Sequence, residues 1–326
     1  MDSASIFNIA SNAEFENTAL QIFDYQYNNN KTYKTFCDHL KIIPSKICKS
    51  IEIPCLPIQF FKTHQIISGS QKAQKVFTSS STTGVEPSKH YVYDLNIYKK
   101  SFLKSFKYFY GDPSEYIILA LLPSYLEREG SSLIYMVTEL IKKTNNPESG
   151  FYLHNTKELY EKLQWLDTTC KKVMLIGVSF ALLDFVEAFP PLSLKNTIVM
   201  ETGGMKGRRK ELIRKELHTI LCKGFSVPSI HSEYGMTELL SQAYSKENGI
   251  YKCPPWMKVF TRDTEDALSL QQPEKTGGIN IIDLANVNSC SFIATQDLGK
   301  IYSNGNFEVL GRFDHSDIRG CNLMAI

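Results

Sequence analysis

The densest group of chemically capable residues is a run of hydroxyl side chains that ends in glycine and is followed by a lysine. The run begins at Thr78, at the end of a short expected strand. Hydroxyls and backbone N–H groups in one turn can surround phosphate oxygens, glycine lets the backbone approach closely, and lysine adds a cation. The candidate phosphate-binding residues are Ser79, Ser80, Ser81, Thr82, Thr83, Gly84 and Lys89. A solvated loop is the alternative interpretation, and the Walker pattern is absent.

A second candidate is the segment Glu233-Tyr-Gly-Met-Thr-Glu238. An aromatic ring can stack on a nucleotide base, a hydroxyl can contact a phosphate, and a carboxylate can bind Mg²⁺. We therefore expect Tyr234 and Gly235 to lie at a base, Thr237 at a phosphate and Glu238 at Mg²⁺. The alternative is a helix N-terminus, with the threonine as its cap and acidic residues in its first turn.

A third candidate combines Thr295-Gln-Asp297 with Gly311-Arg-Phe-Asp314. An ionised aspartate only accepts hydrogen bonds, so Asp297 suits the hydroxyls of a ribose. Arg312 can bridge a ribose and a phosphate. Two ordinary β-turns are the alternative interpretation.

A possible nucleophile is Ser179, which lies between a strand and a helix in the run Gly177-Val-Ser-Phe-Ala181. This resembles a degenerate nucleophile elbow of a serine hydrolase, and Asp297 and His315 follow in the order that a triad needs. However, the glycine that permits the strained turn is missing. The expected role of the serine is therefore to cap a helix.

The elements that position these residues alternate between strands and helices. Strands are expected at 75–78, 116–122, 150–154, 172–177 and 196–200, and helices at 94–110, 131–143, 156–166, 181–189 and 207–222, the last with Gly224 as its C-cap. This alternation predicts an α/β fold with a mostly parallel sheet and helices on both faces. Short runs at 257–261, 278–283, 291–295 and 307–310 predict a small antiparallel β subdomain.

The 326 residues are expected to form a single domain with three parts. These are a helical and extended segment at about 1–75, an α/β body at 76–245, and a β-rich subdomain with a tail at 246–326. No linker rich in glycine, serine or proline interrupts the sequence.

The composition excludes several classes of protein. With 36 Lys+Arg against 34 Asp+Glu, the net charge is +2, which does not indicate nucleic-acid binding. Hydrophobic residues make up 43% and charged residues 21%, so the chain is not intrinsically disordered. It has no apolar run long enough to span a membrane and no secretory signal. The eight cysteines form no C-x-x-C pair. A cytoplasmic protein with free thiols is therefore expected.

The order of the three candidate segments resembles that of the adenylate-forming superfamily, which includes acyl-CoA synthetases, adenylation domains and luciferases. The superfamily motif Y-G-x-T-E is matched in full by Tyr234-Gly-Met-Thr-Glu238. Its T-G-D motif is similar to Thr295-Gln-Asp297, its G-R-x-D motif to Gly311-Arg-Phe-Asp314, and its phosphate loop to 79–89, although Ser81 replaces a usual glycine.

Within that superfamily the chain looks most like the LuxE-type acyl-protein synthetases of the fatty-acid reductase system. Further matching segments are Leu121 to Gly130, Glu201 to Gly204 and Ser316 to Met324. This resemblance places Gly203 and Gly204 at the nucleotide. The superfamily normally continues into a mobile lid domain, which is expected to be absent here.

The resemblance implies that ATP and Mg²⁺ activate a carboxylic acid, with a fatty acid as the implied class. The acyl-AMP would then pass its acyl group to a thiol. Cys321 takes this role by resemblance, and the adjacent Gly320 and nearby Arg319 favour mobility and a lowered thiol pKa. A reductase is the implied partner protein.

Three alternatives remain open from the sequence. The first is an acyl- or aryl-CoA ligase. The second is a serine hydrolase or acyltransferase that uses Ser179. The third is a nucleotide-binding protein without catalytic activity.

Overall fold

The computed structural model describes residues 3–79, 86–122, 130–203 and 212–313. Contacts divide the chain into two compact units. One unit comprises residues 71–254. The other combines residues 1–70 with residues 255–326, so that the N-terminal segment and the β-rich segment form one body. No helix in the described ranges is both long and apolar enough to cross a membrane.

The unit of residues 71–254 is built on a mostly parallel sheet, as predicted. Its strand order is β5-β4-β6-β7-β8-β9, and only β9 runs antiparallel to its neighbour. The strands are β4 (Tyr116–Leu121), β5 (Gly150–Tyr152), β6 (Lys172–Val178), β7 (Thr197–Thr202), β8 (His231–Tyr234) and β9 (Ala243–Ser245). All residues of β4 are buried, as a strand covered on both faces requires.

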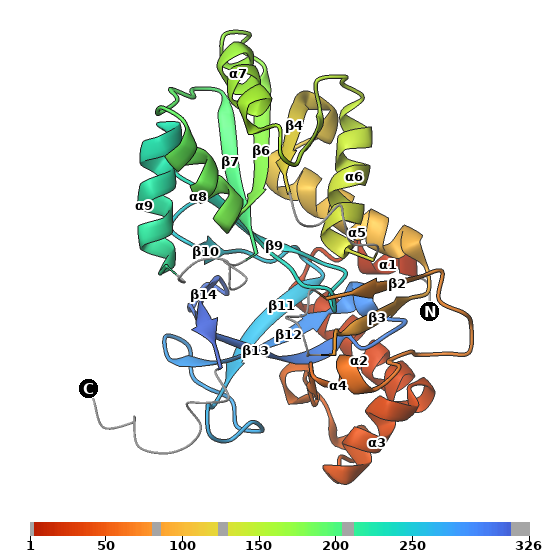
Figure 1. Ribbon diagram of the computed structural model, residues 1–326. Helices are drawn as coiled ribbons and strands as arrows, with labels where there is room; N and C mark the ends of the chain where they lie inside the picture. The colour runs from red at the N-terminus through yellow and green to blue at the C-terminus, as the bar shows by residue number, and fades with distance from the viewer. Residues whose placement is uncertain (1–2, 80–85, 123–129, 204–211, 314–326) are drawn as a thin grey trace. The chain divides into compact units, whose positions relative to one another are not determined.

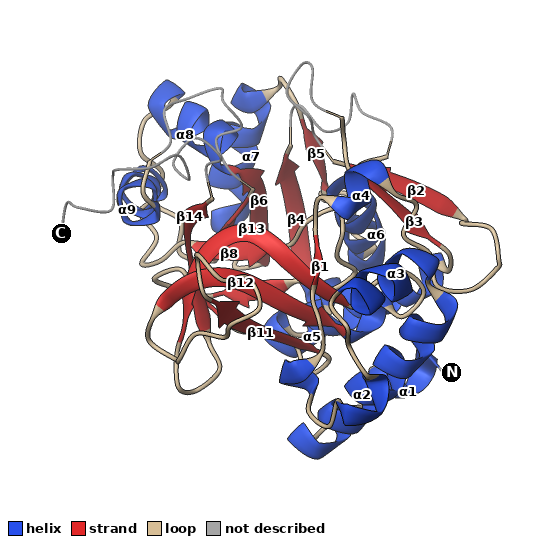
Figure 2. Ribbon diagram, turned by 90° about the horizontal axis from the view of Figure 1, so that it is seen from below, coloured by secondary structure: helices blue, strands red, loops and turns tan. Residues whose placement is uncertain are grey.

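Helices cover both faces of this sheet. They are α5 (Leu95–Tyr110), α6 (Ser132–Thr144), α7 (Thr156–Asp167), α8 (Ser179–Ala188) and α9 (Arg214–Phe225). Figures 1 and 2 show α5 and α6 separated from α8 and α9 by the strands. Right-handed crossovers produce this arrangement, because the chain moves one way from β4 to β5 and the opposite way from β6 to β8.

The reversal of direction makes the carboxyl ends of β4 and β6 a topological switch point. In open α/β sheets, ligands bind in the crevice outside these strand ends. The segments that follow β4, β6, β7 and β8 are therefore the part of this unit that the fold offers to a ligand. The remaining strands of the unit are the hairpin of β2 (Lys75–Thr78) and β3 (Lys89–Val92), and the short β10 (Ile250–Tyr251).

The other unit contains the predicted antiparallel sheet. Its strands are β11 (Met257–Arg262), β12 (Thr276–Asp283), β13 (Phe292–Ile301) and β14 (Phe307–Arg312), which pair in sequence order, while β1 (Leu56–Pro57) pairs with β13 in parallel. Its helices are α1 (Ser3–Ile6), α2 (Asn12–Asn29), α3 (Lys31–His39) and α4 (Phe60–Thr63). Short 3₁₀ turns lie at Pro44–Lys46, Ser50–Glu52 and Leu284–Asn286 here, and at Pro113–Glu115 in the α/β unit.

Buried polar side chains of α2 join the N-terminal segment to the β-rich segment. The Gln26 amide donates to the carbonyl oxygens of Asn286 and Val287, at 3.1 and 2.9 Å. Its carbonyl oxygen accepts from the Ser291 N–H at 3.0 Å. A buried amide needs such partners, so these bonds fix how α2 meets the sheet.

The predicted C-cap at Gly224 is wrong, because this residue lies inside α9. The helix continues to Phe225, and Ser226 adopts the left-handed conformation with φ of 52°. A Cβ atom at Gly224 would lie 2.5 Å from the Cβ of Val186 on α8. The glycine is therefore required by the close approach of two helices.

We expect Gly224→Ala to destabilise the protein by about 1–3 kcal/mol, because the added methyl group overpacks the contact between α8 and α9. Urea unfolding measures the loss. Gly150→Ala is the matched control, since a Cβ there meets nothing within 4 Å. Equal stability of the Gly224 variant and the wild type would contradict the packing account.

Candidate active site

The predicted phosphate loop connects the two strands of the β2–β3 hairpin. Ser79 and Ser88 close its base: the Ser79 N–H donates to the Ser88 carbonyl at 3.1 Å, and the Ser88 N–H donates to Ser79 Oγ at 2.9 Å. Lys89 lies at the start of β3, with its Nζ 3.6 Å from a carboxylate oxygen of Glu86. Both side chains of this pair are largely exposed, so the cation remains accessible to an anion.

The hairpin is also attached to the segment that follows β4. The Thr78 N–H donates to the Gly130 carbonyl at 2.9 Å. Gly130 has a φ of +94°, and a Cβ there would lie 2.9 Å from Thr78 Oγ1. Glycine is therefore needed where the chain returns from the carboxyl end of β4 to the hairpin.

The Y-G-M-T-E motif forms the end of β8 and a tight turn. The Leu239 N–H donates to the Met236 carbonyl at 3.1 Å, which closes a turn with Thr237 and Glu238 at its centre. No helix begins here, so the alternative interpretation of Thr237 as a helix cap is wrong.

A buried histidine that sequence reasoning missed joins this turn to the hairpin. His90 lies on β3 and is 1% exposed. Its Nδ1 lies 2.8 Å from the Thr237 carbonyl oxygen. Because a carbonyl oxygen only accepts, Nδ1 carries the proton and donates. Two candidate segments that are far apart in the sequence are thus held together within one unit.

Glu233 and Thr202 connect the carboxyl ends of β8 and β7. Thr202 Oγ1 donates to Glu233 Oε2 at 2.5 Å. The other oxygen, Oε1, lies against Gly235, where a Cβ atom would be only 2.4 Å away. Burial raises the pKa of Glu233 to about 7, the charge of Glu201 adds to this, and the bond from Thr202 opposes it. A carboxyl group next to the motif therefore titrates near neutral pH.

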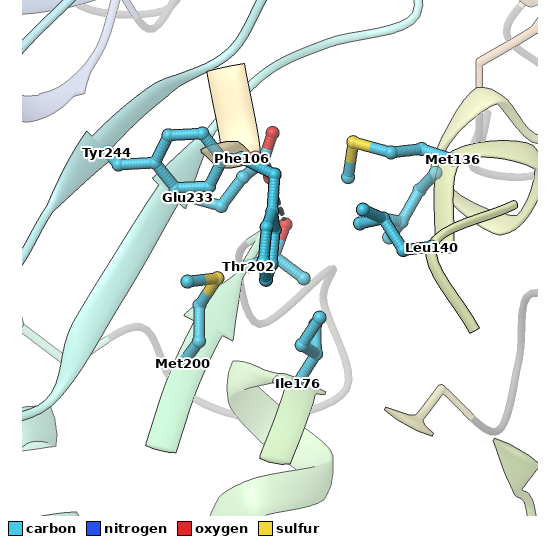
Figure 3. Close-up of a pocket in the computed structure, with 9 residues that line it drawn as sticks. Phe106, Met136, Leu140, Ile176, Met200, Thr202, Glu233 and Tyr244 are labelled. Atoms are coloured by element: carbon cyan, nitrogen blue, oxygen red, sulfur yellow. Dashed lines mark hydrogen bonds between the residues drawn. The ribbon is translucent and has the colours of Figure 1, made fainter. Parts of the chain in front are cut away.

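A small apolar cavity lies beside the carboxyl ends of β6, β7 and β8. Its lining residues are Phe106, Leu133, Met136, Leu140, Ile176, Met200, Thr202, Glu233 and Tyr244. Figure 3 shows Met136 and Leu140 of α6 on one side and Thr202 and Glu233 on the other. The space that the centre of a water-sized sphere can reach is about 10 Å³, close to what one water molecule requires.

The remaining motif residues of this unit are mostly buried. Tyr234 is 9% exposed, and its ring lies 5.7 Å from that of Tyr251. Glu238 is 6% exposed. Gly203 follows β7 with a φ of +69°, and its carbonyl accepts a hydrogen bond from Ser179 at 2.7 Å. Tyr234 and Glu238 of the motif are therefore packed into the unit and do not lie on a protruding loop.

The predicted role of Ser179 as a helix cap is wrong, because it is the first residue of α8, which has no side-chain cap. Its hydroxyl donates to a carboxylate or to the Gly203 carbonyl. Its Oγ lies 3.0 Å from Glu201 Oε2. Glu201 also pairs with Arg214, at 2.5 Å, and lies 3.6 Å from His218 Nε2. The same His218 nitrogen lies 3.4 Å from Ser232 Oγ. Among the residues that the structure describes, no histidine contact that would activate Ser179 as a nucleophile is seen, and His315 lies outside them.

In the other unit, Asp297 and Arg312 are brought together as partners on neighbouring strands. They face each other in the register of β13 and β14, with 3.3 Å between Asp297 Oδ1 and Arg312 Nε. The arginine side chain is 73% exposed and the aspartate 12%. The guanidinium of this pair is therefore accessible to a ligand, whereas the carboxylate is largely buried.

Arg262 is a second arginine that sequence reasoning missed, and it contacts the strands β12 and β13 near Asp297. The buried Arg262 guanidinium donates to the carbonyl oxygens of Ile279 and Thr295, at 2.8 and 2.6 Å. A Cβ at Gly278 would lie 2.7 Å from its Cζ. The glycine makes room for the guanidinium, which holds β12 and β13 together where Asp297 follows.

The described residues contain no cluster of three or more histidine, cysteine or acidic side chains suited to a metal. Mg²⁺ does not require such a cluster, because one or two carboxylates and substrate phosphates commonly bind it. A single carboxylate such as Glu238, next to the residue that contacts the β2–β3 hairpin, fits this mode.

Buried thiols do not suit nucleophilic chemistry in this chain. Burial raises the pKa of Cys37 and of Cys55 to about 12, and it also raises the pKa of Cys290. Cys48 and Cys170 are exposed. Several predicted site residues lie outside the described residues: Ser80, Ser81, Thr82, Thr83, Gly84, Gly204, His315 and Cys321.

Comparison with known proteins establishes the fold. No family model matches the chain, and no curated protein matches its sequence. ATP-bound MatB from Rhodopseudomonas palustris aligns with a TM-score of 0.54 and 15% identity over 73% of this chain. An open conformation of 2-hydroxyisobutyryl-CoA ligase in complex with 2-HIB-AMP and CoA aligns with a TM-score of 0.66 and 11% identity over 93% of this chain.

The thioesterification state of that ligase, also with 2-HIB-AMP and CoA, gives a TM-score of 0.66 and 12% identity over 94% of this chain. The alignments cover 47% of MatB and 70% of the hydroxyisobutyryl-CoA ligase, so the chain spans about half the length of MatB. The chain thus has the large-domain architecture of adenylate-forming enzymes, as predicted.

We expect Glu233→Gln to remove a pH dependence of stability. The folded state binds this proton more tightly than the unfolded state, so the contribution is complete below the ordinary pKa of 4.5 and is lost as the pH rises through about 7. The loss is about 3 kcal/mol by pH 8, from about 1.4 kcal/mol per pKa unit. Urea unfolding at pH 4.5 and pH 8 measures it.

The exposed Glu216 supplies the control variant Glu216→Gln for this measurement. It should keep the pH dependence of the wild type. The same fall in stability in the Glu233 variant as in the wild type would mean that Glu233 does not titrate in this range.

Proposed function

We propose that this protein activates a carboxylic acid with ATP to form an acyl-AMP, and then passes the acyl group to a thiol. The observation that carries the proposal is the hydrogen bond of 2.8 Å between His90 and the Thr237 carbonyl. It joins a hairpin suited to phosphate with the Y-G-M-T-E turn, in a fold shared with ligases that were solved with ATP or an acyl-AMP.

In the first reaction a carboxylate oxygen of the acid attacks the α-phosphorus of ATP. A new bond forms between this oxygen and the α-phosphorus. The bond between the α-phosphorus and the oxygen that bridges to the β-phosphate breaks, and pyrophosphate leaves. Two anions must approach each other, so catalysis consists mainly of positioning and charge neutralisation. Hairpin hydroxyls, backbone N–H groups and Lys89 are assigned to the phosphates.

Glu238 is assigned to hold Mg²⁺ together with the phosphates of the substrate. Mg²⁺, when bound, supplies positive charge against the phosphate oxygens. Thr237 is assigned to a phosphate oxygen through its hydroxyl. The nucleotide itself is assigned to Tyr234 at the base, and to Asp297 and Arg312 at the ribose.

The acyl group is assigned to the apolar cavity that Met136, Met200 and Phe106 help to line. The cavity adjoins the carboxyl ends of the strands, which is where the fold presents a ligand. A fatty acid is the class that the resemblance implies. Since the open space is about 10 Å³, a longer chain requires the flexible methionine side chains to repack.

In the second reaction a thiolate attacks the carbonyl carbon of the acyl-AMP, and AMP leaves as the carbon–oxygen bond breaks. The thiol proton passes to solvent. We assign the thiol to Cys321, on the basis of its Arg-Gly-Cys context and the resemblance to acyl-protein synthetases. A reductase would then be the partner that receives the acyl group.

A CoA ligase is the second candidate function, because the hydroxyisobutyryl-CoA ligase with the same fold was solved with CoA. For the hydrolase alternative, the Ser179 hydroxyl contacts Glu201 and the Gly203 carbonyl in the described part of the chain.

The function is tested by acid-dependent exchange between ATP and labelled pyrophosphate, with a panel of short, fatty and aryl acids. Trapping of labelled acyl protein, with and without CoA, then separates the two acceptors. Exchange with none of the acids would contradict the proposed function.

We expect Glu238→Gln to lower the exchange rate by about 10²–10³-fold, because the variant loses a metal ligand at almost unchanged volume. Exchange is measured at saturating acid over a range of Mg²⁺ concentrations. Glu216→Gln, on the exposed face of α9, is the matched control and should exchange at the wild-type rate. A fully active Glu238 variant would refute the assignment.

We expect Cys321→Ser to keep pyrophosphate exchange and to lose the hydroxylamine-labile acyl label on the protein. The two half-reactions separate because the adenylation residues lie elsewhere in the sequence. The exposed Cys170 gives the control Cys170→Ser, which should keep both activities. A thioester label that persists on the Cys321 variant would place the carrier at another cysteine.

A further inference from the structure

His90 lies on the β2–β3 hairpin, and its side chain contacts the turn formed by the Y-G-M-T-E motif. It follows Lys89 directly on β3, and its side chain is 1% exposed. The contact between its Nδ1 and the Thr237 carbonyl spans 147 positions of sequence. No family motif quoted above includes this residue.

We propose that His90 is a positioning residue for adenylation, which holds the turn at Thr237 and Glu238 against the phosphate hairpin. The inference rests on the proposed function for the identity of the ligand, but the positioning itself concerns only this chain. The histidine is assigned no contact with substrate, and it acts through the backbone of Thr237.

The turn after β8 is stabilised by a side chain from another element, because no helix follows this strand. It closes with a backbone hydrogen bond from the Leu239 N–H to the Met236 carbonyl, and it continues to β9 without an intervening helix. The Nδ1–H of His90 donates to the Thr237 carbonyl in a partly buried contact, and losing a donor to such a carbonyl is unfavourable.

The position of the His90 donor determines how the turn orients the Glu238 carboxylate. Thr237 and Glu238 are adjacent, so the peptide that His90 fixes also orients the carboxylate assigned to Mg²⁺. The hairpin is fixed independently at its base by the two hydrogen bonds between Ser79 and Ser88. His90 therefore sets the distance between the hairpin and the Glu238 carboxylate, which are both assigned to the same phosphates.

The test compares variants that separate the hydrogen bond from the volume of the ring. His90→Asn keeps a donor at the position of Nδ1, because the amide nitrogen of asparagine lies equally far along the side chain. His90→Phe keeps an aromatic ring and removes the donor. His90→Gln places the amide nitrogen one bond too far, and it replaces the phenylalanine variant if that variant does not fold.

Tyr116→Phe is the matched control. The Tyr116 hydroxyl donates to the Tyr110 carbonyl at 2.7 Å, and it is buried. This residue begins β4, so it lies at the amino ends of the parallel strands, away from the candidate site. The control thus removes one donor to one backbone carbonyl in the same unit.

Two readouts are measured for each protein: kcat and KM for ATP in pyrophosphate exchange, and hydrogen–deuterium exchange of the amides at 235–239. We expect His90→Phe to lower kcat/KM for ATP about 10–100-fold and to speed amide exchange in this segment. We expect His90→Asn to stay within about threefold of the wild type, and Tyr116→Phe to change neither readout.

Equal losses in His90→Phe and Tyr116→Phe, or unchanged amide exchange in His90→Phe, would overturn the proposal. So would an asparagine variant as impaired as the phenylalanine variant. If the wild type exchanges no pyrophosphate, the proposed function fails. The amide exchange at 235–239 then still decides whether His90 holds the turn.

Discussion

The hydrogen bond from His90 to the Thr237 carbonyl is the contact on which the candidate active site depends. Most strands of this α/β unit lead into a helix that fixes the chain beyond the strand end. β8 instead leads into a tight turn and an antiparallel strand. The turn that carries Thr237 and Glu238 is contacted by His90 on β3, and Thr202 bonds to Glu233 in β8, just before the turn.

Two buried carboxyl groups near this site have pKa values that are shifted in opposite directions. A carboxyl group at Glu233 is buried next to an apolar cavity, and its pKa lies near neutral pH because burial disfavours the anion. Glu201, by contrast, is paired with Arg214 and lies near His218, and its pKa is lowered despite burial. The ion-paired carboxylate of Glu201 contacts the start of α9, whereas Glu233, which accepts from Thr202, lies where the fold offers a site to a ligand.

The sequence predicted those features whose signal is local. The continuous apolar run at 116–122 is typical of a strand covered on both faces, and the alternation with helices indicated a mostly parallel sheet. The pairing of Asp297 with Arg312 was not predicted, because the expected strands ended before both residues and the register of β13 and β14 is seen only in the structure. His90 could not be found from local patterns, because its partner is remote in sequence and a lone histidine in a strand has no distinguishing pattern. Gly224 was misplaced for a similar reason, since its contact with Val186 is between helices.

The central claim is that an oxygen atom of the acid becomes bonded to the α-phosphorus of ATP. The most direct measurement uses a carboxylic acid labelled with ¹⁸O in both carboxylate oxygens, incubated with the protein, ATP, Mg²⁺ and hydroxylamine to release the acyl group. Mass spectrometry then locates the label. The account predicts one ¹⁸O atom in AMP. Label in inorganic phosphate, or AMP without label, would contradict it.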